Sequence, residues 1–195
     1  MPQLPAMPKI ADAAENTPVE FYWVGAGARL AGTLVHRWLQ MATAGQVQLR
    51  NDLRDKIPSA SQRWLREMGL SDAQIEPIVA RVHAALQGII ADARGQWLLA
   101  GEGFAELALS GVVQGKVESI VLDRVRIDAG IHWIVDYKTS SHEGGDLKSF
   151  LAAESDRYRP QLTKYEEVYR NYASADVRCA LYFPLLQEFV ELSVD

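Results

Sequence analysis

The sequence of 195 residues has one cysteine, no long apolar run and no excess of basic charge. Because Cys179 stands alone, an internal disulfide and a multi-thiolate zinc or iron–sulfur site are excluded, and any metal must bind to oxygen and nitrogen atoms. No window approaches the ~20 apolar residues of a membrane span, and no basic-then-apolar leader opens the chain. We therefore expect a soluble, cytoplasmic protein without a membrane partner. The formal net charge of −5 differs from the basic field typical of nucleic-acid binders. If the chain binds DNA, the contact should be local or supplied by a partner.

The chain has enough apolar residues, 48%, for one compact domain. Residues 1–20 contain four prolines and little periodicity, which predicts an extended lead-in or linker. Apolar residues at three-and-four spacing then predict a helical part at about 28–95, and Ser71 and Gln74 stand at capping-box spacing. The expected helices cover about 29–44, 61–68 and 71–95.

Beyond Gly95 the pattern changes from helical to extended. Runs of β-branched and aromatic residues, separated by glycines and turn signals, predict a three-stranded meander, then helices, then two more strands. The expected strands are about 104–109, 117–125, 133–137, 178–183 and 188–192, and the expected helices are 147–153 and 160–172, with Pro160 in a first helical turn. This order favours an α/β domain with a central mixed sheet flanked by helices, its core at about 100–195.

Two acids and a lysine mark the ends of neighbouring predicted strands. Asp136 and Lys138 are two apart on one strand, so their side chains project from the same face. Asp123 ends the strand upstream, and antiparallel pairing across the turn at 128–130 brings it close to Asp136. Carboxylates forced together repel, and a hard divalent cation is the usual remedy. Two carboxylates, a cation and a lysine are typical of phosphodiester hydrolysis, whereas a strand that only turns polar as it leaves the core is the structural alternative.

Three further residues are candidates for the same site. His36 lies off the apolar stripe of its predicted helix, one turn after Gly32, which leaves room for another element to approach. This suits a ligand reaching across from a separate helix, although a lone histidine is more often structural. Gln161 and Tyr165 lie four apart and share a helix face, where they could touch DNA or support the site. Their structural alternative is a capping amide and a core tyrosine.

Two glycine-rich segments imitate nucleotide-binding loops. In residues 25–32, Leu30 stands where a dinucleotide fingerprint has its third glycine, and residues 111–116 are too closely spaced for a phosphate-binding loop. We therefore expect no nucleotide cofactor.

The motifs together resemble the core of the PD-(D/E)XK nuclease superfamily, across about residues 23–192. The matching segments are Gly32 to Arg37, Leu122 to Arg124, Ile134 to Ser140 and Tyr158 to Tyr165. Their order is most similar to the RecB/AddA-type nuclease domain at the C-terminus of UvrD-like bacterial helicases. The resemblance implies a restriction-endonuclease-like fold, with the nuclease domain at 21–195.

The resemblance also implies roles for individual residues. The implied metal ligands are His36, Asp123, Asp136 and the backbone carbonyl of Tyr137. Lys138 would be the catalytic lysine, Glu106 would match an acidic position of the first core strand, and Gln161 and Tyr165 would form a QxxxY motif. The candidate contacts to the DNA backbone are Arg124, Arg126, Arg157, Arg159 and Lys164.

By this resemblance the chain is a Mg²⁺-dependent deoxyribonuclease, most simply an exonuclease, in which Mn²⁺ can replace Mg²⁺. Relatives with an iron–sulfur cluster hold it with four cysteines, so that variant is excluded. The implied partners are single-stranded DNA or DNA ends and the UvrD-like helicase portion of the same polypeptide or complex. The implied setting is recombination and repair in the bacterial cytoplasm. The alternatives are a catalytically silent DNA-binding or scaffolding module of the same fold and an unrelated α/β protein.

Overall fold

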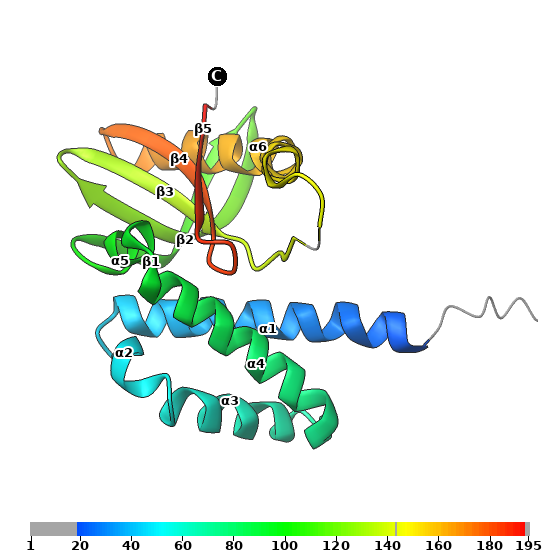
Figure 1. The fold of residues 1–195 in the computed structure, drawn as a ribbon. Helices are drawn as coiled ribbons and strands as arrows, with labels where there is room; N and C mark the ends of the chain where they lie inside the picture. Colours follow the sequence, from blue (N-terminus) through cyan, green and yellow to red (C-terminus); the bar gives the residue numbers. More distant parts are fainter. Residues whose placement is uncertain (1–18, 143, 194–195) are drawn as a thin grey trace, which may run out of the picture.

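The computed structural model describes residues 19–142 and 144–193, so the predicted lead-in at 1–20 lies almost wholly outside the described residues. A helical layer lies below a sheet, and one long helix covers the other face of that sheet (Figure 1). The layer below consists of α1 (Val19–Thr43), α2 (Leu49–Asp52), α3 (Lys56–Glu67), α4 (Asp72–Ala91) and α5 (Ala93–Leu99). The remaining elements are β1 (Gly103–Val113), β2 (Lys116–Asp128), β3 (Ile131–Tyr137), α6 (Leu147–Tyr172), β4 (Asp176–Phe183) and β5 (Glu188–Leu192).

The helical part differs from the prediction at several boundaries. Helix α1 begins about ten residues earlier than expected, α3 begins at Lys56, and the short helix α2 was not predicted. The helix expected to run to Gly95 ends at Ala91, because Asp92 is extended and its carboxylate accepts a hydrogen bond from the Gly95 backbone at 2.8 Å. A new helix, α5, therefore starts there. The start of α4 agrees with the prediction, since the Ser71 backbone N–H donates to Gln74 Oε1 at 2.9 Å.

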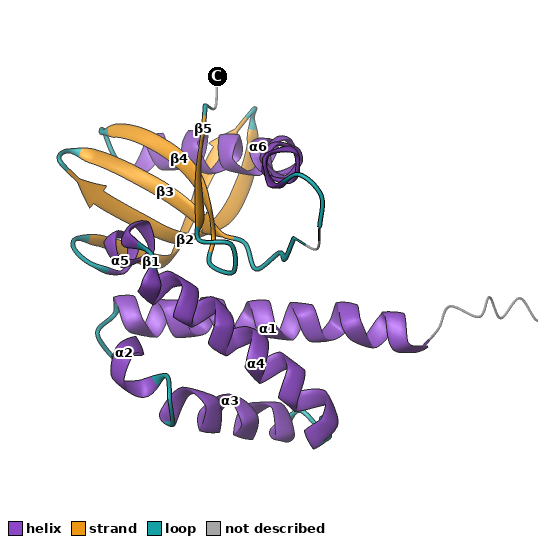
Figure 2. Cartoon of the chain, viewed as in Figure 1, coloured by secondary structure: helices purple, strands orange, loops and turns teal. Residues whose placement is uncertain are grey.

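Within the described residues the sheet is mixed and has five strands in the order β1-β2-β3-β4-β5 (Figure 2). Strands β3 and β4 run parallel and are connected by α6, whereas β1–β2, β2–β3 and β4–β5 are antiparallel pairs. The β1–β2 turn places Gln114 and Gly115 at φ 50° and 76°, as a tight hairpin requires. Gly111, expected to separate two strands, lies inside β1.

Helix α6 is continuous where two helices were expected, and Pro160 lies in its interior. Proline removes one backbone hydrogen bond, but the residues beyond it bury a continuous face against the sheet. Leu162 and Tyr169 are fully buried there. Packing against the sheet thus outweighs the local helix-breaking tendency.

The sheet buries a core on each face, one against α1, α4 and α5 and the other against α6. The predicted α/β class, with a mixed sheet between helices, is confirmed and agrees with a restriction-endonuclease-like fold. In the part of the chain that the structure describes, no helix combines the length and apolar character that crossing a membrane requires.

Candidate functional site

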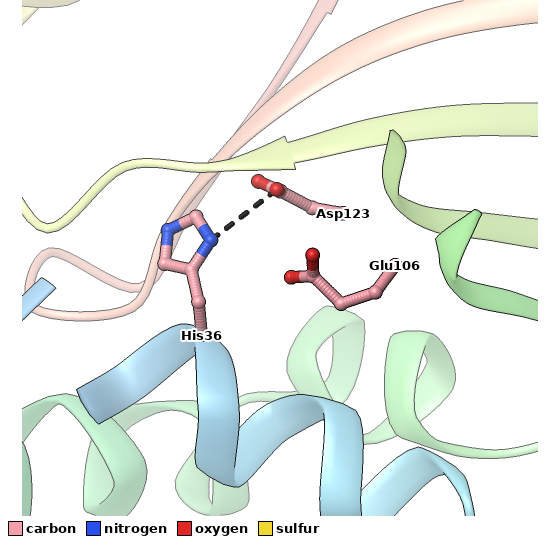
Figure 3. A group of neighbouring side chains, drawn as sticks. All are labelled: His36, Glu106 and Asp123. Atoms are coloured by element: carbon pink, nitrogen blue, oxygen red, sulfur yellow. Dashed lines mark ion pairs between the residues drawn. The ribbon is translucent and has the colours of Figure 1, made fainter. Parts of the chain in front are cut away.

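Three side chains of the kinds that can bind a metal ion, from three elements, meet between α1 and the sheet. His36 of α1, Glu106 of β1 and Asp123 of β2 place one ligand atom each within 4.8 Å of one another (Figure 3). His36 Nδ1 lies 3.2 Å from Asp123 Oδ1. The resemblance gave Asp136 as the third side-chain ligand and Glu106 as an acid of the same site; in the structure Glu106 is the third member of this group.

The backbone of Tyr137 borders the same group. Its N–H donates to Asp123 Oδ2 at 2.9 Å, and its carbonyl oxygen lies 3.1 Å from His36 Nε2. Both ring nitrogens of His36 therefore face oxygens that only accept hydrogen bonds, which favours the protonated ring. Burial lowers the pKa of His36. The hydrogen bond to Asp123 and the negative charges of Asp123, Asp136 and Glu106 raise the pKa by more than burial lowers it, so the net shift is upward.

The strand register explains how the two aspartates approach one another. Pairing of β2 with β3 ends at Arg124 and Val135, and the next positions outward are Asp123 and Asp136. Burial, followed by the negative charge of Asp123, raises the pKa of Asp136 to about 6. Burial and Asp123 likewise raise the pKa of Glu106. Carboxylates this close to one another repel when ionised. A divalent cation relieves that repulsion, so such a group favours cation binding.

Asp136 connects the acidic group to a polar cluster on α6. One of its carboxylate oxygens lies 2.6 Å from Lys138 Nζ, and the other accepts a hydrogen bond from Gln161 Nε2 at 2.8 Å. Gln161 also donates to the Tyr165 hydroxyl at 2.7 Å. The two residues of the predicted QxxxY motif therefore hold each other and Asp136.

Tyr158 belongs to this cluster, and sequence reasoning gave it no role. The Lys138 ammonium lies 3.6 Å from the centre of the Tyr158 ring, so the lysine sits between an aromatic face and the Asp136 carboxylate. The sequence gave one indication of this role, because Tyr158 lies in the same motif as Gln161. The contact itself could not be predicted, because Lys138 follows β3 and Tyr158 lies on α6.

Two of the predicted DNA contacts are wrong. Arg124 is fully buried, and its guanidinium donates to the carbonyls of Leu98 at 2.8 Å and Phe104 at 3.2 Å. Arg126 is also buried and donates to the Trp97 carbonyl at 3.1 Å. Both side chains satisfy carbonyls at the end of α5 that the helix leaves free, so neither is available to DNA.

The other three basic candidates lie on α6, where Arg157 is exposed and Arg159 and Lys164 are half-buried. Each is close to an acid: Lys164 Nζ lies 3.1 Å from Glu118, and Arg157 and Arg159 lie 3.4 Å from Glu154 and Asp156. Arg159 also bonds the Ser193 carbonyl. Their contact with DNA stays a prediction.

The acidic group opens to solvent through a recess of about 450 Å³ lined by residues of α1, β1 and β2, including Arg37 and Val121. A second recess, beside α6, contains Gln161, Lys164 and Tyr165 and shares Val121 with the first. A larger apolar recess lies between α1 and α4, away from these acids. The chemistry, not the size of the recess, identifies the candidate site.

Comparison with known proteins agrees with this arrangement. The model of the PD-(D/E)XK nuclease superfamily matches residues 24–190. A crystal structure from Eubacterium rectale, described as a "Putative exonuclease", is similar in fold, with a TM-score of 0.50 and 15% sequence identity. The similarity covers 86% of this chain but 59% of that one. No curated protein matches the chain.

Proposed function

The chain belongs to the PD-(D/E)XK nuclease superfamily, and on this premise we propose that it is a metal-dependent deoxyribonuclease that acts as an exonuclease. One observation carries the proposal: the group of His36, Glu106 and Asp123 lies against the backbone of Tyr137, directly before the lysine of the Asp136–Lys138 pair. The donor set consists of carboxylate oxygens and an imidazole, which suits Mg²⁺ or Mn²⁺.

The group just named would hold the cation, together with Asp136 and the Tyr137 carbonyl as proposed further ligands. When bound, the cation would lower the pKa of the attacking water and neutralise charge on the scissile phosphate. In the structure the Asp136 oxygens contact Lys138 and Gln161, so these two side chains fix the orientation of the carboxylate.

Lys138 supplies a positive charge beside the proposed cation site. Its ammonium is held between Asp136 and the Tyr158 ring, and from there it can donate a hydrogen bond to the attacking water or to a phosphate oxygen. Attack of the water oxygen on phosphorus, with rupture of the bond from phosphorus to O3′ and transfer of a proton to that leaving oxygen, would give a 5′-phosphate and a 3′-hydroxyl.

The test uses linear and circular single-stranded DNA with Mg²⁺, Mn²⁺ or EDTA. We expect metal-dependent degradation of the linear strand, survival of the circle, and loss of activity in Lys138→Ala. Lys148→Ala, which changes an exposed lysine of α6, is the matched control and should remain active. Cleavage in EDTA, or equal rates for wild type and Lys138→Ala, would contradict the proposal.

Metal binding separates an enzyme from a silent scaffold of the same fold. Calorimetric titration with Mn²⁺ should show binding that Asp123→Asn abolishes and that Asp156→Asn, an exposed control on α6, retains. A chain that neither binds metal nor cleaves DNA would be a scaffold.

We also propose that the domain works with a UvrD-like helicase portion that delivers unwound DNA during recombination and repair in bacteria. The order of the sequence motifs supports this, as does the net charge of −5, which suits delivery of DNA by a partner. Addition of such a helicase with ATP should accelerate digestion of duplex DNA by wild type, and not by Lys138→Ala.

A further inference from the structure

The segment directly after Lys138 is held in an unusual way. Strand β3 ends at Tyr137, and the last sheet-like bond runs from the Lys138 N–H to the Tyr182 carbonyl at 2.8 Å. Thr139, Ser140 and Ser141 then follow in an irregular conformation, outside the sheet. Each of the three is nevertheless contacted by a helix.

Two of these helices contact the segment through small or buried groups. On α1, a Cβ added to Gly32 would lie 3.1 Å from Thr139 Oγ1, so glycine allows the close approach. On α6, the buried Glu154 carboxylate accepts a hydrogen bond from Ser140 Oγ at 3.1 Å.

The third contact comes from α4 through Arg81. Its Nη2 donates to the Thr139 carbonyl at 2.6 Å and lies 3.4 Å from Ser141 Oγ. Its Nε is buried and has no hydrogen-bond partner among the residues that the structure describes. A hydrogen bond from a guanidinium to a carbonyl is charge-assisted and therefore directional as well as strong.

We propose that Arg81 is a positioning residue for Lys138. By holding the Thr139 carbonyl, it fixes the backbone that leaves β3 and thereby keeps the Lys138 ammonium between Asp136 and the Tyr158 ring. The helical layer thus sets the geometry of a residue that belongs to the sheet. This inference rests on the proposed nuclease function and deepens it.

The first test is a kinetic split between Arg81→Met and its control, Arg63→Met, an exposed arginine of α3. Methionine keeps an unbranched, flexible side chain in place of the aliphatic part of arginine and removes the donors. We expect kcat of Arg81→Met to fall by about 10- to 100-fold while KM and its dependence on salt stay unchanged, because a misplaced catalytic group slows chemistry and not binding. Arg81→Lys, which keeps one cationic donor, should recover part of the rate.

Two outcomes overturn the positioning role. An unchanged kcat shows that Lys138 does not depend on Arg81. A raised KM with a smaller salt slope shows that Arg81 contacts a phosphate directly, since loss of such a contact removes counterion release.

Hydrogen exchange gives a readout that needs no activity. In Arg81→Met, the Lys138 amide and the amides of 139–142 should exchange faster, while amides of β1 and β5 stay as in wild type. If wild type fails to cleave DNA but this exchange pattern appears, the nuclease proposal is wrong. The contact of Arg81 with the Thr139 carbonyl then stabilises the backbone without a role in catalysis. Gly32→Val offers an independent approach from α1: it should displace Thr139 and lower kcat even if Arg81→Met is too unstable to assay.

Discussion

Glu106 and Asp123 stand opposite one another at a break in the pairing of β1 with β2. The register pairs Ala105 with Arg124 and Leu107 with Leu122, and the intervening pair is missing. Glu106 has a φ of 51°, a left-handed conformation that costs a residue other than glycine about 1–3 kcal/mol. The surrounding strands therefore hold Glu106 in a strained position beside His36 and Asp123.

Comparison of Glu106→Gly with Glu106→Ala separates this strain from the chemistry. Both variants remove the carboxylate, so both should lose metal binding and cleavage. Glycine adopts the left-handed conformation without a Cβ clash, so Glu106→Gly should be more stable than Glu106→Ala by about 1 kcal/mol in urea unfolding. Equal stabilities would show that the backbone at Glu106 relaxes at no cost.

Gln161 and Tyr165 give an ordered pair of variants. Gln161→Leu leaves the buried Asp136 oxygen without its donor, and we expect the rate to fall by about 10- to 100-fold. Tyr165→Phe removes only the hydroxyl that accepts from Gln161, so its effect should be smaller. Single-turnover cleavage rates check the order. A larger loss in Tyr165→Phe would mean that the hydroxyl acts on DNA and not through Gln161.

The fold was predictable where local pattern and packing agree. Runs of β-branched and aromatic residues located the strands of the sheet, and the Ser71 cap located the start of α4. Helix α6 was split in the prediction because Pro160 disfavours a helix interior, and only the buried face of that helix explains its continuity. Boundaries that depend on tertiary burial are not visible in local sequence.

The candidate site likewise has features that the sequence predicts and features that depend on the tertiary structure. Spacing alone anticipated the approach of Asp123 to Asp136, and Gly32 anticipated a close neighbour, which is Thr139. The resemblance anticipated an acid at Glu106, but its contact with His36 depends on a break in strand pairing that the sequence does not show. The burial of Arg124 depends on free carbonyls at the end of α5, about 26 positions upstream.

Arg124 should therefore contribute to stability and not to DNA binding. Arg124→Met leaves the carbonyls of Leu98 and Phe104 without their donor, and we expect a loss of about 2–3 kcal/mol in the free energy of unfolding. At a temperature where the variant is folded, its KM for DNA should equal that of wild type. A raised KM with unchanged stability would restore the DNA contact that the sequence suggested.

Cys179 reports on the sheet core through its ionisation. The thiol is fully buried on β4, and burial raises its pKa to about 12. Between pH 9.0 and 12 the thiol stays protonated in the folded state but ionises in the unfolded state. Ionisation therefore leaves the free energy of unfolding unchanged below pH 9.0 and lowers it as the pH rises towards 12. Relative to Cys179→Ala, the free energy of unfolding of wild type should fall by about 1.4 kcal/mol per pH unit in this range. A thiol reagent should label the native protein only on unfolding, and rapid labelling at neutral pH would contradict the burial.

Tyr158 tests whether the aromatic ring under Lys138 matters to the site. Tyr158→Leu removes the ring face that the ammonium contacts at 3.6 Å, whereas Tyr158→Phe retains it. A cation–π contact of this kind is worth about 0.5–2 kcal/mol, so a ring that holds Lys138 in place predicts a fall in kcat of several-fold or more for Tyr158→Leu and almost none for Tyr158→Phe. Rates measured at saturating DNA and Mg²⁺ compare the two variants directly. If Tyr158→Phe loses as much activity as Tyr158→Leu, the hydroxyl is the functional group, and the ring is no more than a packing surface for Lys138.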